Sequence, residues 1–220
     1  MSSWRDLKYF ETTVVDNIKL AKNAFLLKIK RNLSFVAGQV VGLGVNTEIE
    51  PRLYSIASGE KDDYVDILYT EKPEGKLTPM LSLLKRGDKI LVSLPFGSFT
   101  NCPDSPVLIA TGTGIAPFIS MLKSGKGRNA TLLHGVSAPE YFYFDNFVKL
   151  ILEDRYIQCC SKPGSTKYFN GRVTQYLKEQ PVNPDKKYYL CGVAEMVVES
   201  RDILISKGVP FNNIIAEIYF

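Results

Sequence analysis

The sequence predicts two domains of different class, an antiparallel β-barrel in the first hundred residues and an α/β domain with a parallel sheet after it. Three observations support this prediction. Six short segments rich in Val, Ile, Leu, Tyr and Phe fill the first part, with turn residues between them. Continuous apolar runs, each followed by helical spacing, fill the second part. The pattern changes within residues 101–106, so we expect domains at 1–103 and 104–220.

The expected strands of the first domain are separated by Asp-Asn, Arg-Asn, Glu-Pro and Arg-Gly-Asp turn signals and span 8–15, 19–30, 37–45, 52–58, 64–70 and 89–94. One helix is expected between the last two, over 79–84, because Thr78 suits the N-cap and Pro79 the first helical position. Six strands with one helix indicate a small antiparallel barrel. Leu53 and Ile56 are expected to face its core.

The second domain has four apolar runs that we interpret as strands, at 107–110, 130–133, 157–160 and 188–191. Helical spacing follows them, for example over 118–123 and 197–206. Strands that are apolar on both faces and alternate with helices predict a parallel sheet covered on both sides.

Composition excludes several classes of function. A hydrophobic content of 45% and a charged content of 23% are ordinary for a globular protein, and no apolar run approaches the roughly 18 residues of a membrane span. The charged N-terminus lacks a secretory signal, so we expect a cytoplasmic protein. One histidine and four irregularly spaced cysteines predict no metal site and no disulfide framework. A net charge of +4 without a basic tract disfavours nucleic acid and is compatible with an acidic partner protein.

Two segments could cradle phosphate. Gly112 and Gly114 follow an apolar strand and open a helix, which lets the backbone approach an anion at the helix N-terminus. A lone G-x-G also fits a plain strand–helix turn. Residues 75–78 combine a glycine, a lysine, free amides and a hydroxyl, although a simple capped helix explains them too.

Cys191 and Gly192 end another expected parallel strand, where ligands of open α/β sheets bind, so they would face the same crevice as Gly112 and Gly114. A buried, inert cysteine is the alternative. Two phosphate cradles, one in each domain, indicate two nucleotides and hence a flavoprotein oxidoreductase.

The motifs RLYSIAS, GKLTP, ATGTGIAPFISML, HGV, LCGVAEM and EIYF occur in the order and approximate spacing of the ferredoxin–NADP⁺ reductase family, which the chain resembles over nearly its whole length. The resemblance implies a six-stranded Greek-key FAD-binding barrel and a Rossmann-like NADP(H)-binding domain. It also implies hydride transfer between nicotinamide and flavin N5, with ferredoxin or flavodoxin as the one-electron partner.

The resemblance implies FAD-binding roles in the first domain. Arg52 would pair with the pyrophosphate, Tyr54 would pack against the flavin ring, and the Ser55 hydroxyl would lie near N5. The set is completed by Leu53, by Asp66, Ile67 and Leu68 beside the ring and ribityl chain, and by Gly75, Lys76, Leu77 and Thr78 in the second phosphate motif.

In the second domain, the resemblance assigns the pyridine-nucleotide pyrophosphate to Gly112, Thr113 and Gly114, and places Cys191, followed by Gly192, beside nicotinamide C4. Tyr219 and Phe220 would form an aromatic cover on the flavin. The expected contacts of the adenosine 2′-phosphate and the adenine are Ser137, Ser161, Lys162, Tyr168 and Arg172. Lys162 stands where arginine is usual, but the absence of an acidic residue favours NADP(H) over NAD(H).

We expect Ser55, Cys191 and Glu217 to form the catalytic set, with Tyr219 as a gate, and Ser55 hydrogen-bonded toward Glu217 would be a proton relay. His134 is expected to be structural. Two alternatives stay open: an NAD(P)H:flavin or small-acceptor reductase, and an electron-transfer subunit of a larger oxidoreductase.

Overall fold

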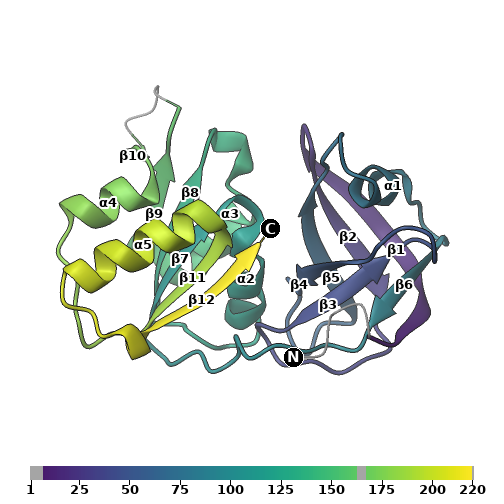
Figure 1. Cartoon of the computed structure of the whole chain (residues 1–220), viewed down its shortest axis with the longest axis horizontal. Helices are drawn as coiled ribbons and strands as arrows, with labels where there is room; N and C mark the ends of the chain where they lie inside the picture. Colours follow the sequence, from purple (N-terminus) through teal and green to yellow (C-terminus); the bar gives the residue numbers. More distant parts are fainter. Residues whose placement is uncertain (1–6, 163–166, 220) are drawn as a thin grey trace. The chain divides into compact units, whose positions relative to one another are not determined.

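A computed structural model describes residues 7–162 and 167–219. The chain divides into two compact units, Met1–Thr100 and Asn101–Phe220, which are described separately below (Figure 1).

The first unit is a six-stranded antiparallel sheet in the order β4-β3-β6-β1-β2-β5. Its elements are β1 (Tyr9–Ala21), β2 (Ala24–Lys30), β3 (Val40–Gly44), β4 (Arg52–Ser55), β5 (Tyr64–Thr70), α1 (Leu77–Leu83) and β6 (Lys89–Ser93). A bridge between Ile56 and Ile67 joins the chain after β4 to β5, so the two outer strands of the sheet meet. The sheet therefore closes on itself, which confirms the predicted antiparallel barrel.

The barrel interior is filled by large aliphatic side chains that alternate along the strands, as half-buried strands require. Leu27, Ile29, Leu43, Ile67 and Ile90 are buried there. Helix α1 adds Leu77 and Leu81 to the same cluster. The helix thus covers one opening of the barrel with apolar residues spaced one turn apart.

The turn predicted at Asp16-Asn17 is wrong. Strand β1 continues through these residues to Ala21, with a register irregularity between Val14 and Asp16. Asn17 is instead used for tertiary contacts: its Nδ2 donates to the carbonyl oxygens of Leu81 (2.8 Å) and Leu84 (3.2 Å). The Leu81 carbonyl also accepts from the Leu84 amide at 3.2 Å, so the Asn17 side chain adds to the C-terminal cap of α1.

The predicted N-cap at Thr78 is also wrong, because α1 begins at Leu77 and has no side-chain cap. The Thr78 hydroxyl accepts a hydrogen bond from the Lys72 amide at 2.8 Å, which closes the loop before the helix. Leu53 does not face the core either, since it is 38% exposed. Tyr54 packs against the core cluster in its place, whereas Ile56 is buried in that cluster as predicted.

The second unit is a parallel six-stranded sheet in the order β10-β9-β8-β7-β11-β12, with helices between the strands. Its elements are β7 (Val107–Thr111), α2 (Ala116–Lys123), β8 (Thr131–Val136), α3 (Asp145–Leu152), β9 (Tyr156–Cys160), β10 (Phe169–Asn170), α4 (Val173–Glu179), β11 (Tyr188–Val193), α5 (Ala194–Ser206) and β12 (Ile214–Tyr219). The four predicted strands are present, which confirms the α/β class. Strands β10 and β12 were not predicted: β10 has only two residues, and a glutamate interrupts the apolar residues of β12.

The two faces of this sheet are covered differently. On one face, Ile109, Leu133 and Leu190 pack in a cluster with apolar residues of α4 and α5, which lie side by side in Figure 1. The alternate residues Ala110, His134 and Gln158 are aligned on the other face. Parallel strands covered on both faces explain why the predicted runs were apolar throughout.

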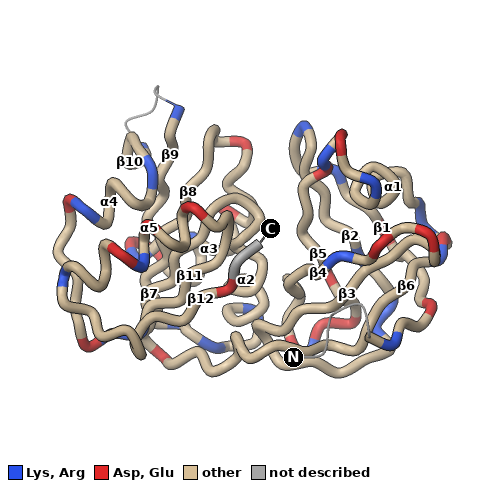
Figure 2. Tube along the Cα trace, in the orientation of Figure 1, with Lys and Arg blue, Asp and Glu red and all other residues tan. Residues whose placement is uncertain are grey.

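Positive and negative residues are interspersed along both units (Figure 2). In the part of the chain that the structure describes, no helix has the length and apolar character needed to cross a bilayer.

Candidate functional site

Strand β4 carries a cation and an aromatic ring in the barrel unit. Arg52 is exposed, with Nη2 3.6 Å from Oε2 of Glu50. Tyr54 lies two residues along, on the same face of the strand and about 7 Å away. Its ring meets Tyr69 edge-on at 6.4 Å, and burial raises the pKa of Tyr54, so the phenol stays protonated. A guanidinium can bind phosphate and an aromatic surface can stack against a ring. Two such groups on one strand face therefore fit a flavin nucleotide.

Ser55 and Leu53 share the opposite face of β4. Ser55 is 2% exposed, whereas Leu53 is 38% exposed and lies opposite Gly42 of β3. The serine hydroxyl is therefore shielded from bulk solvent, and its expected place near flavin N5 stays a prediction.

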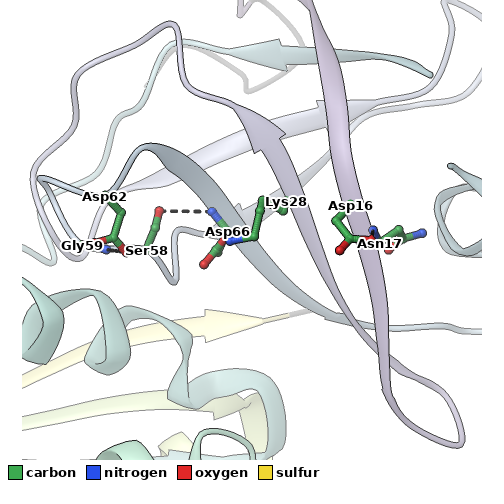
Figure 3. Close-up of polar contacts among 7 residues, drawn as sticks. All are labelled: Asp16, Asn17, Lys28, Ser58, Gly59, Asp62 and Asp66. Atoms are coloured by element: carbon green, nitrogen blue, oxygen red, sulfur yellow. Dashed lines mark hydrogen bonds and ion pairs between the residues drawn. The ribbon is translucent and has the colours of Figure 1, made fainter. Parts of the chain in front are cut away.

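The segment that follows β4 is tied to β5 around Asp66 (Figure 3). The Asp66 amide donates to Oγ of Ser58 at 3.1 Å, and its carbonyl accepts from the Ala57 amide at 2.8 Å. The Asp66 side chain is 6% exposed and pairs with Nζ of Lys28 at 2.8 Å. Ile67 and Leu68 are buried beside it. This strand is thus held rigidly, and its predicted contact with FAD stays a prediction.

The segment 75–78 presents a second group of polar atoms. Gly75 and Lys76 are exposed, Thr78 is half-buried, and Leu77 is buried in the barrel core. The Thr78 hydroxyl is already bonded to the Lys72 amide. Among the residues expected to hold phosphate here, Lys76 therefore supplies an exposed positive charge.

The glycine loop after β7 lies tightly against the end of β11. Gly112 has φ +53°, a left-handed conformation that favours glycine, and a Cβ added there would meet no atom within 4 Å. A Cβ at Gly114 would overlap the carbonyl oxygen of Cys191. A Cβ at Gly192 would similarly overlap the hydroxyl of Thr111. The loop can follow this path only with glycine at position 114.

The Thr111 hydroxyl supplies a direct test of whether this loop fits a polar ligand. Its oxygen is buried and has no hydrogen-bond partner in the described part of the chain. Buried polar atoms are rarely left unpaired, and exceptions often mark binding sites. It lies at the end of β7, before a 3₁₀ turn at Gly112–Ile115 that leads into α2. The loop and the N–H groups at its turn therefore suit the phosphates of a nucleotide.

The order of the strands places this loop at the switch point of the sheet. From β7 the chain continues to β8, β9 and β10 on one side and then returns to β11 and β12 on the other. Ligands of open α/β sheets bind at the carboxyl ends of the strands where the order reverses. The loop at Gly112–Ile115 and the end of β11 flank that point.

Cys191 and Glu217 lie side by side at this end of the sheet. They are paired in register across β11 and β12, with Sγ 3.9 Å from Oε2. Cys191 is buried and Glu217 is half-buried. Tyr219 lies opposite Val193 in β12, and Phe220 falls outside the described residues.

Of the residues expected to hold the 2′-phosphate and the adenine, four follow the carboxyl ends of β8, β9 and β10, whereas Tyr168 precedes β10. The Ser161 amide donates to the Val136 carbonyl at 3.1 Å, which places the ends of β8 and β9 side by side. Tyr168 is half-buried against Phe142, with ring centroids 5.0 Å apart. The exposed members of the set are Ser137, Ser161, Lys162 and Arg172.

Sequence reasoning missed Thr111, for which a threonine just before a G-x-G turn was the available signal. It expected His134 to be structural, and the histidine is fully buried, with its Nε2 3.1 Å from the carbonyl oxygen of Gly112. A histidine inside an apolar strand gave no indication of this partner. Among the described residues, no three His, Cys, Asp or Glu side chains form a metal-binding group.

Comparison with known protein families agrees with this arrangement. Residues 11–101 match the oxidoreductase FAD-binding domain, and residues 108–202 match the oxidoreductase NAD-binding domain. The chain is therefore an oxidoreductase with one domain for each nucleotide.

Similar proteins include a ferredoxin–NADP reductase of Pseudomonas aeruginosa, 30% identical over 86% of this chain and 86% of that protein. The toluate 1,2-dioxygenase electron transfer component of Pseudomonas putida is 31% identical over 89% of this chain, which spans 63% of that protein. The chain spans 56% of the propane 2-monooxygenase reductase component of Mycolicibacterium goodii, at 31% identity over 80% of this chain. A crystal structure of a ferredoxin NADP⁺ reductase from Neisseria gonorrhoeae with bound FAD and NADP shares the fold, with a TM-score of 0.88, 22% identity and coverage of 98% of this chain and 100% of that one.

Proposed function

This chain belongs to the ferredoxin–NADP reductase family, and from that premise we propose that it transfers electrons between NADP(H) and a ferredoxin-type carrier protein through FAD. The observation that carries the proposal is the glycine loop packed against the end of β11 at the switch point of the sheet, beside a buried and unpaired Thr111 hydroxyl. A flavodoxin as the carrier, and a cytoplasmic location, are further parts of the proposal.

In the barrel unit, the residues of β4 hold and orient the flavin nucleotide. Arg52 and Lys76 are exposed cations that bind its phosphates. Tyr54 supplies an aromatic surface for the ring, and the shielded Ser55 hydroxyl holds a proton for N5. Bound FAD supplies the conversion between two-electron hydride chemistry and one-electron transfer.

In the second unit, the loop 112–114 binds the pyrophosphate of NADP(H), and Lys162 and Arg172 bind the 2′-phosphate. Tyr168 stacks with the adenine. Cys191 borders the nicotinamide, and Glu217 beside it accepts or returns the proton that Ser55 exchanges. An aromatic cover of the flavin by Tyr219 and Phe220, which opens when the nicotinamide enters, is part of the proposal on the family resemblance alone.

The test is a spectroscopic titration of the purified chain after incubation with FAD. We expect a yellow protein that retains flavin through gel filtration and bleaches anaerobically with NADPH at lower concentration than with NADH. The reduced protein should then reduce an added [2Fe–2S] ferredoxin, and a parallel reaction with flavodoxin examines that carrier. A protein that binds no FAD, or that neither nucleotide bleaches, contradicts the proposal.

A second candidate function is electron transfer to an oxygenase. It is favoured by the similarity to the toluate and propane oxygenase components, in which this chain spans 63% and 56% of the length. NADH bleaching the flavin at lower concentration than NADPH, together with failure to reduce a free ferredoxin, would favour this candidate over the first. Loss of flavin during gel filtration would favour a reductase that uses flavin as a substrate.

A further inference from the structure

His134 is completely buried in the second unit, yet both of its ring nitrogens have polar partners. Nε2 lies 3.1 Å from the carbonyl oxygen of Gly112, and Nδ1 lies 3.1 Å from the hydroxyl oxygen of Tyr156. The histidine comes from β8 and Gly112 from the loop after the neighbouring strand β7. A buried side chain therefore links the interior of the sheet directly to the loop.

These two partners determine the tautomer of the ring. A carbonyl oxygen can only accept, so Nε2 carries the proton that Gly112 accepts. Nδ1 then has a lone pair and accepts from the Tyr156 hydroxyl. Burial lowers the pKa of His134 to about 4, which keeps the ring neutral near pH 7. Of the two neutral tautomers, only the Nε2–H form satisfies both bonds.

The bond to Gly112 also sets the direction of the next amide. In a trans peptide the carbonyl oxygen and the following N–H lie on opposite sides of one rigid plane. All described peptide bonds are trans, so a Gly112 carbonyl directed at His134 turns the Thr113 N–H away from the histidine. Next to the Thr113 amide, a Cβ added to Gly112 would meet no atom within 4 Å.

A chain of contacts holds the histidine ring in place. Tyr156 is hydrogen-bonded by the Gln158 side chain, whose Nε2 donates to Oδ1 of Asp145 at 2.8 Å. Asp145, at the start of α3, also pairs with Lys149 at 2.7 Å. The ring of Phe142 meets His134 edge-on at 5.5 Å. The loop is thereby connected to two further elements, β9 and α3.

We propose that His134 is a positioning residue for nucleotide binding: it holds the Gly112 carbonyl inward so that the Thr113 amide faces the pyrophosphate of NADP(H). The inference rests on the proposed function of the 112–114 loop and adds a residue that does not itself touch the nucleotide. Tyr156 contributes by fixing the tautomer that donates to Gly112.

The experiment uses the FAD-loaded chain and compares the affinities for NADP⁺ and for 2′-AMP, which lacks the pyrophosphate. His134→Phe keeps an aromatic ring but removes the donor, and should raise the Kd for NADP⁺ about tenfold. The Kd for 2′-AMP should change less than about twofold, because its binding does not use the loop. His134→Gln restores an N–H donor and should recover part of the affinity. Tyr188→Phe is the matched control, since that buried hydroxyl bonds only to Asn183 among the contacts described.

Nitrogen-15 NMR of the histidine ring provides a readout that does not depend on binding. We expect the neutral Nε2–H tautomer at pH 7 in the wild type, and a larger fraction of the Nδ1–H form in Tyr156→Phe. An Nδ1–H tautomer in the wild type, or an unchanged Kd for NADP⁺ in folded His134→Phe, overturns the inference while the proposed function stands. If the wild type binds no NADP⁺, the proposed function fails and the inference with it.

If His134→Phe does not fold, Tyr156→Phe decides the question. Its Kd for NADP⁺ should rise more than its Kd for 2′-AMP. Equal changes for the two ligands would show a general loosening of the domain and would contradict a positioning role.

Discussion

Glu217 lies directly opposite Cys191 in the neighbouring strand, with its Oε2 3.9 Å from the cysteine Sγ. The two residues are 26 positions apart in the chain and meet because β12 adds to the edge of β11 in parallel register. The pair places a carboxylate and a thiol at the carboxyl end of the sheet, next to the switch point where the nucleotide is proposed to bind.

The first prediction concerns proton exchange. Glu217→Ala should retain FAD but reduce the rate of hydride transfer from NADPH by about 10²-fold, because a positioned acid or base typically contributes at least this much. Stopped-flow bleaching of the flavin under anaerobic conditions measures the rate. Glu179→Ala, a change in an exposed carboxylate of α4, is the control. An unchanged rate in Glu217→Ala would remove the glutamate from the relay.

The second prediction concerns the close approach of the glycine loop to β11. Gly114→Ala places a methyl group against the carbonyl of Cys191, so the loop must move away from the strand. We expect NADP⁺ binding to weaken by about tenfold or more with FAD retention unaffected, since misplacing binding groups strongly reduces their contribution. Calorimetric titration with NADP⁺ measures this loss.

Gly208→Ala is the matched control for this glycine. Gly208 has φ +89°, and its added Cβ would meet no atom within 4 Å. It should lose about 1 kcal/mol of stability from the left-handed backbone without altering nucleotide affinity. Equal affinity losses in the two variants would refute the role of the close contact.

The third prediction concerns the choice between NADP(H) and NAD(H). Lys162 and Arg172 are exposed cations near the carboxyl ends of β9 and β10. Replacing both with alanine should weaken NADP⁺ binding by about tenfold or more and leave NAD⁺ binding nearly unchanged, because only NADP⁺ carries the 2′-phosphate. Parallel titrations at two salt concentrations provide the measurement, with a smaller salt dependence expected for the variant. Similar losses for both nucleotides would place the 2′-phosphate elsewhere.

The fourth prediction concerns the ion pair between Lys28 and Asp66. Lys28→Met removes the partner of a carboxylate whose side chain is 6% exposed. The free energy of unfolding should fall by about 2 to 3 kcal/mol, because a buried carboxylate loses an ion-pair partner. Urea denaturation measures the change. Lys178→Met breaks the exposed pair with Glu199 and should cost less than about 1 kcal/mol. Comparable costs for both variants would show that burial does not strengthen the Lys28 pair.

The fifth prediction concerns pH. The pKa of His134 is lowered to about 4 by burial, whereas an unfolded histidine titrates near 6.5. Between these values the unfolded chain binds a proton that the folded chain does not. The stability contributed by the neutral ring is therefore fully present above about pH 6.5 and falls by roughly 3 kcal/mol as the pH drops toward 4.

Urea unfolding of wild type and His134→Gln between pH 7.5 and 4.5 tests this dependence. The difference between their unfolding free energies should shrink as the pH falls, because the variant has no group to protonate at this position. Parallel pH profiles would show that His134 does not titrate in this window.

The sequence by itself determined the class of each unit and the positions of most strands. Continuous apolar runs in β7, β8, β9 and β11 and the alternating segments of the barrel are local patterns, and a strand's period depends only on its own residues. The glycines at 112 and 114 indicated a tight turn for the same reason, since the conformational freedom of glycine is a property of the residue.

Only the tertiary structure decided the pairings on which the site depends. By its sequence context, Asn17 is typical of a turn and Thr78 of a helix cap. In the folded chain Asn17 instead bonds to carbonyls of α1, and Thr78 bonds to the Lys72 amide. The partner of Cys191 lies in an edge strand 26 residues away, and the partner of His134 lies in a loop 22 residues away. These contacts arise from strand order and register, which long-range packing sets and which no short stretch of sequence encodes.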